Sequence, residues 1–395
     1  TSDDPSDGVK VDVDRNGEVH VQPALDANGA AKVTLDSETI ERALEQAAGD
    51  HLQIRVEADG SMNELHVELP VNDIFRNDQA SIDRIELDTG LAKVTVSTEL
   101  IAKASAAPKQ VSISVAVADN SGLTGEALEK LKDAKVYDLS LAIDGVEVSE
   151  LDGRSDVRVA IPYELQPGED PNQVVAYYID DLGELKVVKN GRYNEETGMV
   201  EFRPKQPGTF AASHVSVSFD DVSEGWAKDA IDALAARGIV NGVGGRLFDP
   251  DSHVTRAEFI TMLMNLFELT NEETSTTLSD VETGAWYYTE IATAQQLGIV
   301  KGKPDGSFGV NDEISRQDMA VMAYRALQVV QLELAEGTID RFADYARVAE
   351  YAQDAVAAMQ AVGIIHGMGN GEFAPDAHAS RAQAAMIIYN LLNQL

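Results

Sequence analysis

Apolar and polar residues alternate along short segments of the first half of the chain. Examples are "VKVDV" from Val9, "LQIRVEA" from Leu52 and "QVSISVAVA" from Gln110. Turn clusters such as "DRNG" and "DNSG" separate these segments, because Gly and Asn tolerate the positive φ angles of tight turns. An alternation with a period of two is typical of strands with one buried face. The pattern predicts antiparallel strands in a mostly-β, sandwich-like architecture up to about residue 217.

This β-rich part contains a weak internal duplication. "AKVTLDSETIERALEQA" from Ala31 and "AKVTVSTELIAKASAA" from Ala92 both read as a strand followed by a short helix. We therefore predict two related β-rich domains, residues 1–85 and 86–217, with the join within residues 77–90. Within the second, "GEALEKLKDA" predicts a short helix and "YNEETGMVEF" a closing hairpin.

The pattern becomes helical after Ser218, and there a longer unit recurs three times. Its first segment ("WAKDAIDALAARG", "WYYTEIATAQQLG", "YAQDAVAAMQAVG") places apolar residues at helical spacing, with a glycine to end the helix. Its second begins with "TRAE", "SRQD" or "SRAQ", the capping-box pattern of a helix start. The equivalent positions include Phe248, Phe308 and Phe373. We expect helix, loop and helix in repeats over about 218–270, 277–330 and 341–395.

Composition narrows the class of protein. The 395 residues carry 67 acidic and 31 basic side chains, a formal net charge of -36, and both parts of the chain are acidic. Such a field repels nucleic acid and anionic membranes. No apolar run approaches 18 residues, so no membrane segment is expected. Cysteine is absent, which excludes disulfides. The first residues lack the features of a signal peptide, so the chain is either a mature product or an excised piece of a longer protein, and we expect the excised piece.

The triplicated motif resembles the S-layer homology (SLH) motif. The likeness is carried by "FDDV" at Phe219, "LSDV" at Leu278 and "FADY" at Phe342, each followed by an aromatic residue, a "GIV.G"-like run and "TRAE" or its variants. The resemblance implies an all-α, pseudo-threefold trefoil with a central helical bundle in residues 218–395. The preceding β-rich part looks like the region before SLH triplets in large surface proteins.

The resemblance also implies a function. SLH triplets bind secondary cell-wall polysaccharide, typically with pyruvate ketals, and hold proteins on the surface of Gram-positive cells. We therefore expect an extracellular, non-catalytic anchor, monomeric as a fragment, that tethers a larger surface protein. The main alternative is part of a self-assembling S-layer lattice. A third hypothesis places polysaccharide hydrolysis in the β-rich half, although no catalytic motif supports it.

The arginine of "TRAE" is the first candidate binding residue. A guanidinium in the first turn of a helix opposes the helix dipole by about 0.3–1 kcal/mol, and a bound carboxylate would reverse this effect. The arginines either bind the ketal carboxylate or pair with the motif aspartates and stabilise the fold. The arginines are Arg256, Arg316 and Arg381, and the aspartates are Asp221, Asp280 and Asp344.

Aromatic and loop residues complete the candidate sites. Trp226, Trp286 and Tyr351 begin the first helices and either stack on sugar rings or anchor the core. The second glycine of each loop, namely Gly242, Gly302 and Gly367, serves either a tight loop or close ligand approach. Asn241, Lys301 and His366 share one repeat position and either tune each groove or are solvated.

The three copies are not equivalent. Tyr351 replaces tryptophan in the third copy, and "SRAQ" ends in glutamine, so we expect the best site between the first two copies. We expect no cofactor and no metal site, because the histidines are scattered in sequence. "DVDRNGEV" from Asp12 imitates an EF-hand loop, but Pro23 stands at its twelfth position, so we predict a hairpin turn.

Overall fold

The chain forms two compact units, one ending at His214 and the other starting at Val215. The structure is a computed structural model that describes residues 9–47, 49–57, 60–75, 82–119, 123, 125–151, 156–222, 225–332 and 341–395. The division lies close to the predicted change from β-rich to helical sequence.

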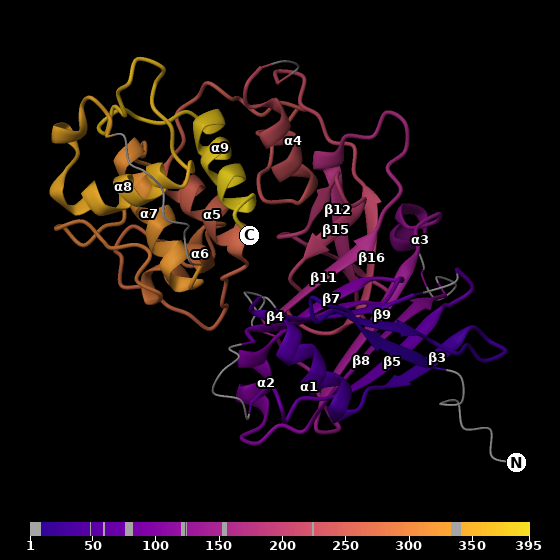
Figure 1. The fold of residues 1–395 in the computed structure, drawn as a ribbon. Helices are drawn as coiled ribbons and strands as arrows, with labels where there is room; N and C mark the ends of the chain where they lie inside the picture. Colours follow the sequence, from indigo (N-terminus) through magenta and orange to yellow (C-terminus); the bar gives the residue numbers. More distant parts are fainter. Residues whose placement is uncertain are drawn as a thin grey trace, which may run out of the picture. The chain divides into compact units, whose positions relative to one another are not determined.

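The N-terminal unit contains two mixed β-sheets (Figure 1). The first has the strand order β1 (Lys10–Val13), β2 (Val19–Gln22), β4 (His51–Val56), β6 (Arg84–Asp88), β7 (Lys93–Ser97), β11 (Val157–Pro162), β15 (Met199–Phe202) and β14 (Arg192–Asn194). The second has the order β13 (Leu185–Val188), β12 (Val174–Ile179), β16 (Gly208–His214), β9 (Val136–Ile143), β8 (Gln110–Ala118), β5 (Glu64–Pro70) and β3 (Ala30–Thr34), with β10 (Val146–Glu147) beside β9.

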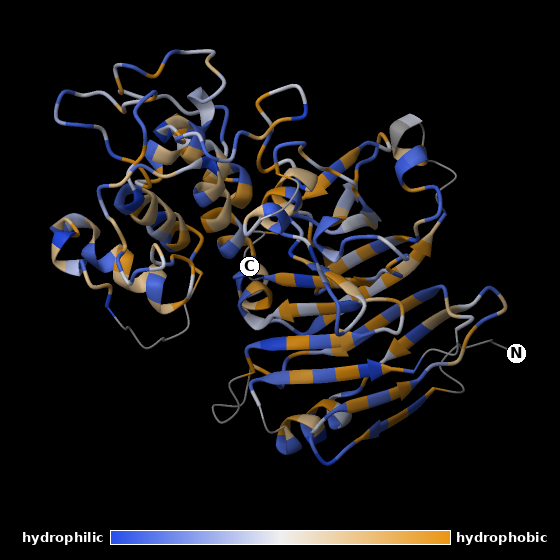
Figure 2. Ribbon diagram, turned by 90° about the horizontal axis from the view of Figure 1, so that it is seen from above, coloured by the Kyte–Doolittle hydropathy of each residue, from blue (hydrophilic) through white to orange (hydrophobic). Residues whose placement is uncertain are grey.

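The alternating sequence pattern buries one face of each sheet. In β5, Leu65, Val67 and Leu69 are fully buried, whereas the residues between them are partly exposed. Figure 2 shows the same alternation as bands of colour along the strands. Buried residues of both sheets form a single hydrophobic cluster. The predicted mostly-β character of this half is confirmed.

Several local predictions are confirmed. Helix α1 (Ser37–Gln46) follows β3, and α2 (Thr98–Ala104) follows β7. Among the described residues of this unit, further short helices are α3 (Gly125–Lys130) and η2 (Pro171–Gln173). The pair β14 and β15 forms the predicted hairpin. The EF-hand-like stretch is a hairpin turn between β1 and β2, in which the Asp14 carboxylate accepts hydrogen bonds from the backbone N–H groups of Asn16 and Glu18.

Strand direction differs from the prediction. The pairs β2 with β4, β4 with β6 and β3 with β5 are parallel. The reason lies in the order of the strands, since the chain alternates between the two sheets from β2 to β6. A strand therefore meets its next-but-one neighbour in the same sheet, running in the same direction, and the intervening strand serves as the crossover that parallel pairing needs. The alternation of side chains records burial and carries no information on direction.

The predicted boundary between residues 85 and 86 needs correction. It falls inside β6, which pairs with β4 on one side and with β7 on the other. In the second sheet β5 pairs with β8 along its whole length, which again joins the two predicted domains. The strand-helix duplication is therefore built into one compact unit.

The C-terminal unit repeats a helix, a loop and a second helix. The first helices are α4 (Lys228–Ala236), α6 (Tyr288–Gln296) and α8 (Gln353–Ala361), and the second are α5 (Arg256–Phe267), α7 (Arg316–Val329) and α9 (Arg381–Leu392). The third copy adds η3 (Tyr345–Arg347) and η4 (Glu350–Ala352). Helix α6 packs on α5, α8 on α7 and α4 on α9, so that the three copies close a ring. Within the described ranges, no helix has the length and apolarity of a membrane span.

One core holds this unit together. Phe248, Phe308 and Phe373 are at most 1% exposed within it. The glycine that ends each first helix has positive φ, as at Gly238 with 62°. The second glycine has another role, because a Cβ atom at Gly242 would lie 2.6 Å from the Leu247 carbonyl oxygen and 2.7 Å from the Phe219 ring.

The fragment 86–217 tests the corrected boundary. We expect it to remain unfolded, because it lacks β1 to β5 and the first residues of β6. Strand β8 then loses β5 and β7 loses part of β6, so each strand keeps a complete partner on one side only. Residues 9–217 should fold and unfold cooperatively. Far-UV circular dichroism and amide chemical-shift dispersion distinguish the two, and a well-dispersed spectrum from 86–217 would restore the two-domain interpretation.

Candidate functional site

The second helix of each copy begins at its arginine. Thr255, Ser315 and Ser380 are the N-caps, and their hydroxyl oxygens accept hydrogen bonds from the N–H groups three residues later. The capping box is complete at Thr255 and Ser380. At Ser315 only the hydroxyl half is present, because the Asp318 carboxylate points to other partners.

The arginine of the first copy reaches into the second copy. The Nε of Arg256 donates to the Phe308 carbonyl oxygen at 3.0 Å, and its Nη1 lies 2.9 Å from the Asp318 carboxylate. The guanidinium also lies over the Phe308 ring, 4.8 Å from its centroid.

The other two arginines make equivalent contacts with the copy that follows them in the ring. Arg316 of the second copy donates to the carbonyl oxygens of Phe373 and His366 in the third, at 2.7 and 2.8 Å. Arg381 of the third copy donates to the carbonyl oxygen of Phe248 in the first, at 3.0 Å. It also donates to the Asn241 carbonyl at 3.1 Å and to the Glu258 carboxylate at 2.8 Å. Each copy therefore holds the next, and the third holds the first.

In the part of the chain that the structure describes, the motif aspartates form no ion pair with the three arginines, although the charge of Arg381 acts on Asp221 and that of Asp344 on Arg316. Their direct contacts are with the backbone. Asp280 accepts hydrogen bonds from the backbone N–H groups of Phe308, Gly309 and Val310, at 2.6 to 3.0 Å. Asp221 and Asp344 accept equivalent bonds in their own copies. Burial by itself would raise the pKa of each carboxyl, but the backbone hydrogen bonds outweigh it and the pKa of each is lowered. They fix the loop whose carbonyl oxygen receives the arginine.

The aromatic residues at the starts of the first helices lie outside the core. Trp226 is 65% exposed, Trp286 61% and Tyr351 58%. The Tyr351 hydroxyl donates to the Asp318 carboxylate at 2.8 Å. Burial of this hydroxyl and its bond to Asp318 raise the Tyr351 pKa to about 12. Asp318 is thus a meeting point of all three copies, with Arg256 from the first and Tyr351 from the third.

The remaining candidates divide between structure and surface. A Cβ atom at Gly302 would lie 2.7 Å from the Leu278 side chain, and one at Gly367 would lie 2.9 Å from the Glu372 carbonyl oxygen, so these glycines allow close packing. Lys301 and His366 are exposed, as is Asn241.

The three arginines differ in whether a carboxylate of the next copy forms an ion pair with them. The third position of each second helix is Glu258, Asp318 or Gln383. Arg381 and Arg256 contact the two carboxylates, whereas Arg316, only 6% exposed, forms no ion pair with any residue that the structure describes. Burial lowers the pKa of Arg316, and the charge of Asp344 opposes this effect from a longer distance. The capping-box pattern already marked these positions, but sequence reasoning did not identify them as partners of the arginine from the preceding copy.

The N-terminal unit has a separate polar cavity of about 510 Å³, lined by residues that include Glu86, Glu99, Arg158 and Arg203. Burial, with the nearby charges of Arg158 and Arg192, lowers the pKa of Arg203 to about 10. The cavity carries charges of both signs.

Comparison with known families identifies the helical repeats. The S-layer homology domain matches residues 218–260, 277–320 and 341–385. The C-terminal unit therefore contains three SLH repeats.

Relatives share these repeats within much longer proteins. The amylopullulanase of Thermoanaerobacterium thermosulfurigenes is 33% identical over 262 residues, which is 65% of this chain and 14% of that protein. The exoglucanase XynX of Acetivibrio thermocellus is 38% identical over 45% of this chain and 16% of its own length. The surface-layer 125 kDa protein of Lysinibacillus sphaericus is 30% identical over 43% of this chain and 14% of its length. The chain thus spans less than a fifth of these relatives, and the matches indicate a location at the surface of a Gram-positive bacterium.

The arginine contacts predict a large effect on stability. We expect Arg381→Ala to lower the free energy of unfolding of the C-terminal unit by about 3–5 kcal/mol, because it leaves the Glu258 carboxylate and two carbonyl oxygens without their partner. The matched control is Arg246→Ala, which removes an exposed ion pair with Asp220 and should cost less than about 1 kcal/mol. Denaturant unfolding monitored by tryptophan fluorescence measures both, and equal effects would contradict the assignment.

The lowered pKa values of the motif aspartates predict acid sensitivity. The unfolded chain binds protons to these carboxyls near pH 4, above their native pKa values, so their contribution to stability is present above that pH. It is lost as the pH falls through the native pKa values. Between pH 6 and 3 the wild type should therefore lose more stability than Asp344→Asn, whereas Asp251→Asn, an exposed residue of the first loop, should behave as wild type. Parallel pH profiles for Asp344→Asn and the wild type would refute this role.

Proposed function

We propose that the chain is a non-catalytic cell-wall anchor. In this proposal the SLH unit binds secondary cell-wall polysaccharide that carries pyruvate ketals, the β-rich unit is a spacer, and a larger surface protein is the cargo. SLH domains anchor surface proteins to the cell wall, which supports the general function. The ring of helix contacts supports the pseudo-threefold trefoil around a central bundle.

The observation that carries the proposal is an exposed aromatic ring beside a buried arginine. We call each place where the arginine of one copy meets the third helical residue of the next copy a joint. Arg256, Asp318 and Tyr351 meet at one joint. Helix α4 packs on α9 and α6 on α5. If the repeat symmetry holds at these positions, Trp226 belongs to the joint of Gln383 and Arg316, and Trp286 to the joint of Glu258 and Arg381. A sugar ring stacks on an exposed indole while its polar groups meet the rim.

Charge balance selects one of these joints for a ketal carboxylate. Arg256 and Arg381 already have protein carboxylates as partners, whereas Arg316 has neutral Gln383 at the equivalent place. An anionic sugar at the Gln383 joint would place a carboxylate in direct contact with this desolvated guanidinium, which otherwise has only the more distant charge of Asp344. This joint combines the third copy with Trp226 of the first, so the proposal departs from the expected site between the first two copies.

The substitution Gln383→Glu tests this location. It installs the residue found at Glu258, which keeps the capping box, and it gives Arg316 a carboxylate that repels the ligand. We expect affinity for the ketal-bearing polysaccharide to fall at least tenfold, about 1.4 kcal/mol, in calorimetry. Thermal stability should be unchanged or higher.

Two exposed aromatic variants provide the comparison. Trp226→Ala should weaken binding about as much as Gln383→Glu, whereas Tyr351→Ala should change affinity less than threefold, about 0.65 kcal/mol. Unchanged affinity in Gln383→Glu, with binding otherwise intact, would contradict the proposed joint. Equal affinity of the wild type for polysaccharide with and without its ketals would contradict the ligand. Ordered sheets on addition of calcium would favour the S-layer lattice.

A further inference from the structure

The three copies also meet at their loop ends, just before the second helices. There the backbone N–H of Val254 donates to the Ala379 carbonyl, that of Ile314 to Val254 and that of Ala379 to Ile314, at 3.0, 3.0 and 3.1 Å. These bonds close a triangle with one residue from each copy. All three residues are fully buried, so the triangle holds the backbone of the three loops in defined positions relative to one another.

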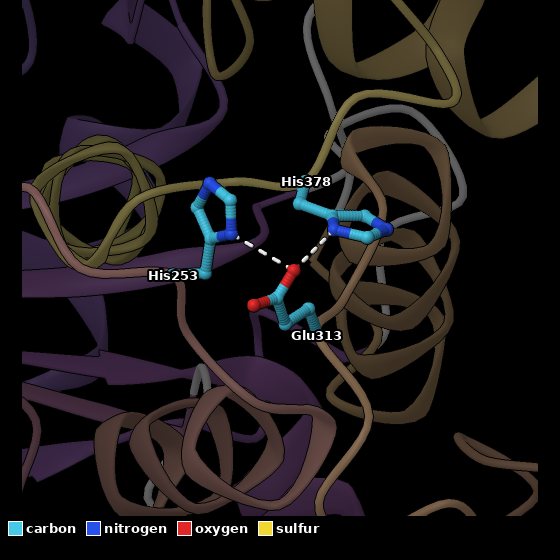
Figure 3. A group of neighbouring side chains, drawn as sticks. All are labelled: His253, Glu313 and His378. Atoms are coloured by element: carbon cyan, nitrogen blue, oxygen red, sulfur yellow. Dashed lines mark hydrogen bonds and ion pairs between the residues drawn. The ribbon is translucent and has the colours of Figure 1, made fainter.

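The residues immediately before this triangle are His253, Glu313 and His378. Successive side chains of an extended segment point to opposite sides, so these three face solvent while their neighbours face the core. The Nδ1 of His253 lies 2.8 Å from the Glu313 Oε2, and the Nδ1 of His378 contacts the same oxygen (Figure 3). The two imidazole rings stand edge to face with their centroids 5.6 Å apart.

This group has the chemistry of a transition-metal site. Two imidazole nitrogens and one carboxylate oxygen lie within 4.8 Å of one another, and each comes from a different copy. Imidazole favours Zn²⁺, Ni²⁺, Co²⁺ and Cu²⁺ over Ca²⁺ and Mg²⁺. Three protein ligands with water in the open position are a common zinc arrangement. The side chains are 46 to 49% exposed, so an ion can enter and the rings can move apart to admit it.

We propose that His253, Glu313 and His378 bind one divalent transition-metal ion and that this ion cross-links the three SLH repeats. The ion takes the place of the hydrogen between each Nδ1 and Glu313: a neutral ring then carries its proton on Nε2, and a charged ring releases one proton to solvent. Three coordinate bonds thus replace two hydrogen bonds. Since the ion binds only where all three copies meet, it stabilises the closed ring relative to the unfolded chain.

A second group of similar composition gives a natural control. Asp14, Glu18 and His20 lie together on the β1–β2 hairpin of the N-terminal unit. There, however, Asp14 accepts backbone hydrogen bonds and Glu18 pairs with Arg55 at 2.9 Å. These ligands are already engaged, and we expect no tight site.

The experiment uses the full chain, free of any polyhistidine tag and treated with chelator. Titration with Co²⁺, followed by its visible absorption, and with Zn²⁺ in calorimetry should show one tight equivalent. Zn²⁺ should raise the melting temperature of the C-terminal transition, whereas the same concentration of Mg²⁺ should not. His378→Ala and His253→Ala should each weaken the tight equivalent at least tenfold and abolish the melting shift, and His20→Ala should leave both unchanged.

The exposure of the three side chains makes these variants compatible with folding, which circular dichroism checks. Undiminished Co²⁺ affinity in both His253→Ala and His378→Ala would overturn the proposal. So would several weak equivalents that Mg²⁺ displaces, because that behaviour belongs to the acidic surface as a whole. Polysaccharide affinity is measured in parallel, so that failure of the metal site is distinguishable from failure of the anchor.

Discussion

A guanidinium buried at the first turn of a helix is stable only when oxygen atoms surround it, and here those oxygens belong to the next copy of the repeat. Arg256, Arg316 and Arg381 each meet the carbonyl of a buried phenylalanine in the following copy. The charge would otherwise oppose the helix dipole and lose hydration. The unfavourable position of the charge is therefore compensated only when the ring of three copies is closed.

The rest of the SLH unit supports this interaction. The motif aspartates hold each loop so that its phenylalanine carbonyl faces the arginine, and the close-packed glycines let the loop lie against its own copy. The third helical residue then decides the local charge. Where it is Glu258 or Asp318 the arginine forms an ion pair with it, and where it is Gln383 the arginine has no such pair and only the charge of Asp344 acts on it. A difference of one side chain thus makes three similar joints chemically distinct.

Sequence periodicity predicted the strands, the helices and the triplication, because burial and capping are local properties of the chain. Strand direction and the single β-rich unit could not be predicted in this way, since they depend on the alternation of successive strands between two sheets. The arginines were predicted as candidates, but their partners in the next copy required the closed ring. His253 and His378 looked scattered because 125 positions separate them, although they hold equivalent places in the repeat.

Native-state hydrogen exchange of the unmodified chain tests the central claim most directly. If the arginines join the three copies into one cooperative unit, the slowest amides of α5, α7 and α9 should open with the same free energy and the same dependence on denaturant. Separate opening free energies for the three helices, each with its own smaller denaturant dependence, would show that the copies are independent and would contradict the account.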